Sequence, residues 1–111
     1  MVYQIYVTAH AAEGAKKLHP DIRKDIKAEL KTLIEKPYKG KPLQQELQGF
    51  YSLRVSRYRA IYTVRTDLKI VEVWAIGHRK DIYELFSELV LNGSIPLRGF
   101  IESRQRDNVN E

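Results

Sequence analysis

The chain has 111 residues, enough for one domain with little room for a second. Hydrophobic residues make up 43% of the chain and charged residues 30%, which excludes wholesale disorder and is typical of a folded domain. There is no cysteine, which excludes disulfides, thiolate catalysis and cysteine-ligated zinc, and suits a reducing compartment. The net charge of +5 favours a polyanionic partner, and an open surface groove is expected because so short a chain buries only a modest core.

The first half of the chain predicts one strand and two helices. Val2 to Thr8 is rich in β-branched and aromatic residues and predicts a strand. Ala9 to Leu18 predicts a short helix that Gly14 weakens. A second helix begins at Pro20 and ends before Pro37, because proline is favoured in a first turn and stops a helix elsewhere. The two helices form a helical hairpin.

The second half predicts a sheet and one more helix. Tyr38 to Gly49 contains Pro42 and two glycines and predicts a loop. Three strands are expected next and then a helix, at Phe50 to Arg57, Tyr58 to Thr66, Ile70 to Ile76 and Asp81 to Leu91. The predicted order is β-α-α-β-β-β-α, an α+β fold whose antiparallel sheet carries helices mostly on one face. Residues 1–93 are expected to form the domain, and residues 94–111 a partly mobile extension.

No membrane segment or secretory leader is expected. Residues 1–9 lack a basic region followed by an apolar one, and no stretch approaches the roughly 20 apolar residues of a membrane helix. The sequence therefore predicts a cytoplasmic protein.

Basic residues gather on the predicted strands and directly after the last one. Adjacent strands lie about 4.8 Å apart, so arginines on neighbouring strands can share one binding footprint. The arginines on the strands are Arg54, Arg57, Arg59 and Arg65, and the sequence His78-Arg79-Lys80 follows. Such a cluster is best explained by a phosphate backbone that neutralises it, because a guanidinium group donates two parallel hydrogen bonds to phosphate. Solvent-facing arginines remain the simpler alternative for any one of them.

Two residues are candidates for proton transfer near these arginines. RNA cleavage by attack of the 2′-hydroxyl group needs a base for that hydroxyl and an acid for the leaving oxygen, and fixed cations can stabilise the phosphate charge without a metal. His78 and Tyr83 are the candidates, and cationic neighbours favour the deprotonated forms of both. Packing roles are the alternative for each. His10 and His19 have no partner at ligand spacing, so no metal site or cofactor is expected.

At this point the sequence resembles the RelE/ParE superfamily of toxin–antitoxin toxins, over most of the chain up to about Leu91. The resemblance depends on four segments: Leu47-Gln48-Gly49, Tyr51-Ser52-Leu53-Arg54-Val55, Tyr58-Arg59-Ala60-Ile61-Tyr62 and Gly77-His78-Arg79-Lys80-Asp81-Ile82-Tyr83. It implies metal-independent cleavage of mRNA on the ribosome, with a 2′,3′-cyclic phosphate as product. It also implies a cognate antitoxin, acidic where it binds the toxin, and a toxin–antitoxin hetero-oligomer.

The resemblance assigns roles to individual residues. The basic strand residue of the family falls on Arg54, the arginine of its Tyr-Arg pair on Arg59, its arginine after the strand on Arg79, and its C-terminal tyrosine on Tyr83. The catalytic set is therefore Arg59, Arg79, Tyr83 and His78, and the substrate-binding set is Arg54, Arg57 and Lys80.

One departure keeps alternatives open. Some active members have a lysine where this chain has Ser52, so the base role could shift to His78 or Tyr83, or activity could be lost. The leading interpretation is a ribosome-dependent mRNA endoribonuclease that inhibits translation. The alternatives are a ParE-like toxin that poisons DNA gyrase and an inactive relative that only binds its antitoxin. Codon preference, the identity of the antitoxin and the oligomeric state are not encoded in any recognisable pattern.

Overall fold

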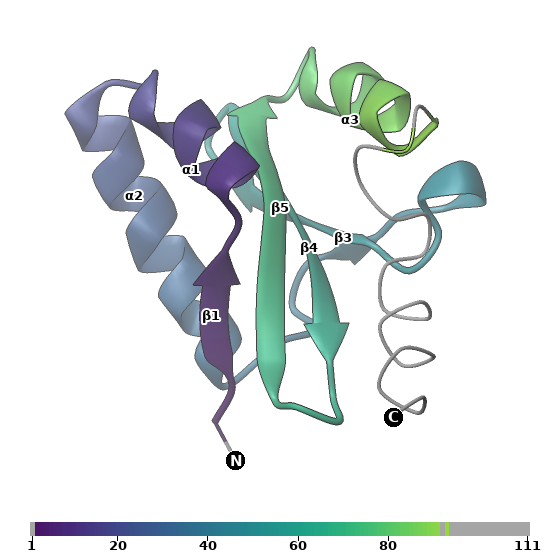
Figure 1. The fold of residues 1–111 in the computed structure, drawn as a ribbon. Coiled ribbons are helices and arrows are strands. Elements are labelled where there is room, and N and C mark those ends of the chain that lie inside the picture. Colours follow the sequence, from purple (N-terminus) through teal and green to yellow (C-terminus); the bar gives the residue numbers. More distant parts are fainter. Residues whose placement is uncertain (1, 92, 94–111) are drawn as a thin grey trace.

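A computed structural model describes residues 2–91 and residue 93. In chain order the elements are β1 (Gln4–Val7), α1 (Ala9–Lys16), α2 (Pro20–Lys31), the single-turn 3₁₀ helix η1 (Thr32–Ile34), β2 (Lys41–Pro42), a second such turn η2 (Gln45–Leu47), β3 (Tyr51–Val55), β4 (Tyr58–Arg65), β5 (Ile70–His78) and α3 (Ile82–Leu91). The predicted α+β fold is confirmed, with the helical hairpin and the last helix in the expected places (Figure 1). The predicted extension over residues 94–111 lies outside the described residues.

The five strands form one sheet in the order β1-β5-β4-β3-β2. Strands β2 to β5 pair antiparallel, as predicted, but β1 joins β5 in parallel, so the sheet is mixed. Strand β2 lies in the segment that was predicted to be a loop, and it adds a short outer strand beside β3. Neither detail follows from local patterning, because both depend on which distant strand each segment meets.

The two N-terminal helices begin at capping residues. The Thr8 side chain accepts a hydrogen bond from the Ala11 amide, and His19 Nδ1 accepts one from the Asp21 amide. Pro20 occupies the first turn of α2, as predicted, where its missing amide proton costs no helical hydrogen bond. Both helices end earlier than predicted, and η1 completes the segment before Pro37.

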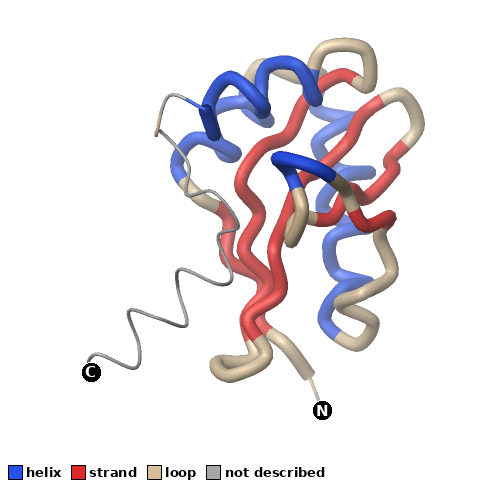
Figure 2. Tube along the Cα trace, turned by 90° about the vertical axis from the view of Figure 1, so that its right-hand side faces the viewer, coloured by secondary structure: helices blue, strands red, loops and turns tan. Residues whose placement is uncertain are grey.

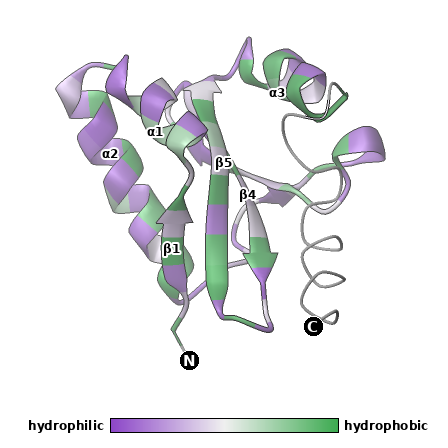
Figure 3. Cartoon of the chain, viewed as in Figure 1, coloured by the Kyte–Doolittle hydropathy of each residue, from purple (hydrophilic) through white to green (hydrophobic). Residues whose placement is uncertain are grey.

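The sheet separates two hydrophobic cores. Helices α1 and α2 cover one face, where Ala11, Ile26 and Leu30 pack on the strands, and α3 covers the other through Ile82 and Phe86. Figures 1 and 2 show the sheet between the two groups of helices, and Figure 3 shows that most residues of α2 are hydrophilic. The expectation of helices mostly on one face therefore holds for α1 and α2, but α3 lies opposite.

A bulge in β5 changes which face its residues meet. Ile61 pairs with Ala75 and Tyr62 pairs with Val73, which leaves Trp74 as an extra residue between the two pairs. Trp74 packs in the α3 core and its indole N–H donates to Thr63 Oγ1 at 2.9 Å. The prediction that Trp74, Tyr58 and Tyr62 are packing residues is confirmed.

Candidate functional site

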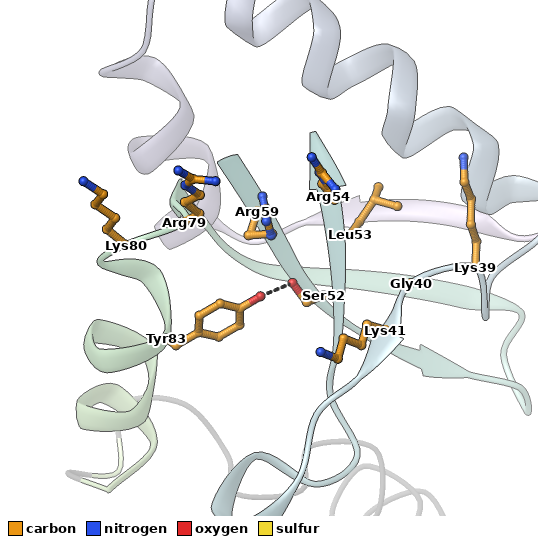
Figure 4. A pocket seen from close by; sticks show the side chains of 10 residues that line it. All are labelled: Lys39, Gly40, Lys41, Ser52, Leu53, Arg54, Arg59, Arg79, Lys80 and Tyr83. Carbon is orange, nitrogen blue, oxygen red and sulfur yellow. Dashed lines mark hydrogen bonds between the residues drawn. The ribbon is translucent and has the colours of Figure 1, made fainter. Parts of the chain in front are cut away.

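An open cleft of about 690 Å³ lies between β2, β3 and the start of α3. Its walls come from four separate stretches of the chain (Figure 4), namely Lys39-Gly40-Lys41, Ser52-Leu53-Arg54, Arg59, and Arg79, Lys80 and Tyr83. No acidic residue is among the described residues that line it. A cleft with this lining attracts an anion.

Two arginines face each other on the floor of the cleft. Arg54 on β3 is the register partner of Arg59 on β4. Because successive strand residues point to opposite faces, Leu53 and Val55 enter the core with α1 and α2, and Ser52 and Arg54 face the α3 side. Like charges directly opposite in a sheet are unfavourable in the free protein. An anion bound between them would relieve this repulsion.

The hairpin between β3 and β4 orients the Arg59 side chain. One terminal nitrogen, Nη1, donates to the carbonyl oxygens of Ser56 and Tyr58 at 3.2 and 2.8 Å. Ser56 has a φ of 57°, a left-handed conformation that a non-glycine residue adopts at a cost. The Arg79 amide donates to the Arg57 carbonyl at 2.7 Å, so the same turn also holds the backbone that carries Arg79.

A hydrogen bond joins the sheet to α3 within the cleft. The hydroxyl oxygens of Ser52 and Tyr83 lie 2.7 Å apart, and either can donate. Tyr83 lies in the first turn of α3, directly after Ile82, whose Cδ1 atom would lie 3.0 Å from a Cβ atom at Gly77. The hydrogen bond thus ties the first turn of α3 to β3.

The edge of the cleft is held by buried aromatic residues. The Gly40 amide donates to the Tyr62 hydroxyl at 2.9 Å, and the rings of Tyr51 and Tyr62 stack with their centroids 5.5 Å apart. Burial raises the pKa of Tyr62 to about 12, and the hydrogen bond from Gly40 opposes that rise. Tyr62 therefore stays protonated at neutral pH and anchors the segment that precedes β2.

The structure brings together five of the seven predicted site residues. Those five are Arg54, Arg59, Arg79, Lys80 and Tyr83. His78 and Arg57 do not line the cleft. The ring of His78 lies edge-on to Tyr58, which faces the α1 and α2 core, and its Nδ1 atom accepts from the Lys80 amide.

Two of the arginines on the predicted strands, Arg57 and Arg65, do not line the cleft. Arg57 lies in the β3–β4 turn, where its carbonyl group is the part that supports the site. Arg65 is at the far end of β4, buried and paired with Asp67 at 3.2 Å, so it does not belong to the arginine cluster that the sequence suggested.

One wall of the cleft was not predicted from the sequence. Lys39, Gly40 and Lys41 fall in the segment that was predicted to be a loop, and they enter the site because β2 pairs with β3. The two lysines that flank Gly40 were the sequence signal for a basic site in this segment. They could not be assigned to the cleft, because no local pattern indicates which strand this segment joins.

No three histidine, aspartate or glutamate side chains in residues 2–91 and 93 come close enough together to hold a metal ion. None of the helices within this part of the chain is long and apolar enough to cross a membrane.

Sequence comparisons identify similar proteins. Residues 5–83 match the family described as the ParE toxin of the type II toxin–antitoxin system parDE. The toxin RelG of Mycobacterium tuberculosis is 33% identical over 85 residues, which cover 75% of this chain and 98% of RelG. The toxin RelE of the same organism is 29% identical over 85 residues, 75% of this chain and 88% of the relative.

Solved structures with the same fold include free toxins and complexes. The toxin–antitoxin complex RelBE2 of Mycobacterium tuberculosis contains a chain with 30% identity and a TM-score of 0.66, covering 71% of this chain and 100% of its own length. A mutant of the E. coli toxin RelE in the free state has 26% identity and a TM-score of 0.67, covering 83% and 98%.

Proposed function

Because this chain belongs to the RelE/ParE superfamily of type II toxin–antitoxin toxins, we propose that it is an endoribonuclease that cleaves mRNA on the ribosome and inhibits translation. The observation that carries the proposal is the hydrogen-bonded pair of Ser52 and Tyr83 hydroxyls in a cleft lined by Arg54, Arg59 and Arg79. A group that can exchange protons thus lies beside cations that suit a phosphodiester.

The proposed reaction needs no metal. The 2′-oxygen of the RNA attacks the adjacent phosphorus, and Tyr83 accepts or orients the proton of that hydroxyl. Arg59 and Arg79 stabilise the charge that develops on the non-bridging oxygens. The bond from phosphorus to the 5′-oxygen breaks, and the leaving oxygen takes a proton from solvent in the open cleft. The products are a 2′,3′-cyclic phosphate and a 5′-hydroxyl group.

The remaining predicted residues support these steps in the proposal. Arg54 and Lys80 bind the RNA backbone, since both line the cleft and are exposed. Arg57 positions Arg79 through its carbonyl group, and His78 positions Lys80 through Nδ1. Ser52, at the position where some family members have a lysine, fixes the Tyr83 hydroxyl by its hydrogen bond.

We also propose an antitoxin partner with an acidic toxin-binding segment. The lining of the cleft includes five basic residues besides Arg59, and a peptide of opposite charge would cover them and block RNA. Two structures with this fold are described as toxin–antitoxin complexes, which supports a hetero-oligomer with an antitoxin.

The test is single-turnover cleavage of a defined mRNA on programmed ribosomes. Primer extension should map cuts within the translated codons, and a single 2′-deoxy substitution at the mapped nucleotide should abolish the cut there, because the nucleophile is removed. If the mRNA stays intact and gyrase-dependent supercoiling is lost, the ribonuclease proposal is wrong and the protein poisons gyrase instead. Intact mRNA with normal supercoiling would leave an inactive relative that binds only its antitoxin.

A further inference from the structure

Lys41 lies at the open edge of the cleft, beside the hydroxyl pair. It is the register partner of Ser52 across strands β2 and β3, and it lines the same cleft. Partners across an antiparallel pair point to the same face, so Lys41 faces the side of the sheet on which Ser52 meets Tyr83. Figure 4 shows the Lys41 side chain on one side of the Ser52–Tyr83 hydrogen bond and the arginine side chains on the other.

The backbone of this edge is well held. The amide of Gly40 donates to Tyr62, and the amide of Leu43 donates to the Phe50 carbonyl at 2.9 Å. Gly40 itself leaves no room for a side chain, because a Cβ atom would lie 2.7 Å from the Tyr62 hydroxyl oxygen and 2.9 Å from the Ser52 carbonyl oxygen. Lys41 therefore extends from a fixed position.

The two lysines of this edge differ in their partners. Lys39 donates to Glu29 Oε1 and to Thr32 Oγ1, both at 3.1 Å, so an acid on α2 already neutralises its ammonium group. Lys41 forms no ion pair with any other residue that the structure describes. Its charge is thus available to an anion that enters the cleft.

We propose that Lys41 binds a second phosphate of the RNA strand, adjacent to the phosphate that the arginines hold for cleavage. The proposal rests on the proposed ribonuclease function. A single strand carries a phosphate at every nucleotide, and the cations on the two sides of the hydroxyl pair would grip successive phosphates. An ammonium group binds phosphate as a point charge, without the fixed geometry of a guanidinium group, which suits a contact that holds the strand and takes no part in bond breaking.

The experiment pairs Lys41→Gln with single neutral linkages in the RNA. After the cut is mapped, mRNAs are made with one methylphosphonate linkage either 5′ or 3′ of the scissile phosphate. Lys41→Gln should lower kcat/KM roughly ten-fold, through KM and not kcat, on the natural RNA. One of the two neutral linkages should lower kcat/KM of the wild-type protein by the same factor. That linkage should not lower kcat/KM of Lys41→Gln any further.

Two variants serve as controls. Lys36→Gln removes the same charge from an exposed position that does not line the cleft and should leave kcat/KM within about two-fold of the wild-type value, because solvent and salt screen that charge from the bound RNA. Lys41→Arg keeps the charge and should retain most of the activity.

Binding gives a second measurement that does not need cleavage. On a single-stranded oligonucleotide made uncleavable by 2′-deoxy nucleotides, the slope of log affinity against log salt should be smaller by about 0.7 in Lys41→Gln than in the wild type. The role of Lys41 would be overturned if Lys41→Gln left the salt slope or kcat/KM unchanged. It would also be overturned if Lys41→Gln lowered kcat/KM by the same factor on the RNAs with neutral linkages as on the natural RNA. In each case, cleavage by the wild type would still support the proposed function. Absence of both cleavage and binding in the wild type would overturn both.

Discussion

Arg54 and Arg59 are direct cross-strand partners in the β3–β4 hairpin, so two arginines lie side by side on the same face of the sheet. Like charges at that spacing lower stability by a few tenths of a kcal/mol to about 1 kcal/mol relative to neutral pairs. The protein keeps this unfavourable pair at the floor of the cleft. Such a loss of stability in the free protein is expected where the same two charges favour binding of an anionic ligand.

The first prediction concerns the stability of this pair. Arg54→Gln should raise the free energy of unfolding of the free protein by about 0.5 kcal/mol at low salt, and the gain should shrink in 0.5 M salt because ions screen the repulsion. Urea unfolding at two salt concentrations measures it. The matched control is Arg65→Gln, which should lower stability by about 1–3 kcal/mol because Arg65 is buried and paired with Asp67. A loss of stability in Arg54→Gln at low salt would contradict the repulsion.

The second prediction concerns the hydroxyl pair. Tyr83→Phe should slow single-turnover cleavage by about 10²-fold or more, because it removes the hydroxyl that accepts or orients the nucleophile's proton in the proposed reaction, while the ring remains. Ser52→Ala should slow it less, since it removes only the hydrogen bond that orients the phenol. Equal rates for wild type and Tyr83→Phe would exclude Tyr83 from the chemistry.

The third prediction compares two cations. Arg79→Ala should lose cleavage rate by about 10²-fold, because Arg79 lines the cleft and, in the proposed reaction, stabilises the charge on the phosphate. Lys69→Ala should cleave like the wild type, because Lys69 lies in the β4–β5 turn with its ammonium nitrogen 5.6 Å from the centre of the Tyr3 ring. The same ribosome assay measures both, and similar losses would count against the site.

The fourth prediction reverses an expectation from helix propensity. Alanine favours a helix by about 1 kcal/mol over glycine, so Gly14→Ala would stabilise an isolated α1. In the folded protein a Cβ atom at this position would lie 2.7 Å from the backbone oxygen of Ile76 on β5. We expect Gly14→Ala to lower the free energy of unfolding by about 1 kcal/mol, because relieving that contact costs more than the propensity returns. Urea unfolding measures it, with the exposed Glu13→Ala as control.

The fifth prediction follows from the buried phenol of Tyr62. Its pKa is raised from 10.0 to about 12 in the folded protein, mainly by burial, so the folded state holds this proton more tightly than the unfolded state. The resulting stability is complete below pH 10 and is lost as the pH rises toward 12. Relative to Tyr62→Phe, the wild type should lose about 1 kcal/mol between pH 9 and pH 11. A constant difference between the two proteins over that range would contradict the raised pKa.

Some site residues could be predicted from the sequence, and others could not. Arg54 and Arg59 lie on strands joined by a short turn, so local pairing alone brings them together. His78 is a candidate from the sequence because its imidazole can transfer a proton beside the arginines, but β5 continues to His78 and pairs it with Tyr58. Strand alternation then fixes its side chain on the Tyr58 face. The predicted end of the strand, at Ile76, had left its direction undetermined.

The sequence by itself determined the three helices, the four longer strands, their order along the chain and five of the side chains that line the cleft. Periodicity, capping residues and turn residues act over a few positions, so α1, α2, α3 and the β3–β5 strands follow from local patterns. Only the tertiary structure decided that β1 joins β5 in parallel, that β2 brings Lys41 opposite Ser52, and that Tyr83 reaches the Ser52 hydroxyl. These contacts depend on strand register and on how closely a helix approaches the sheet, which are set by packing between distant segments and not by the residues next to them in the chain.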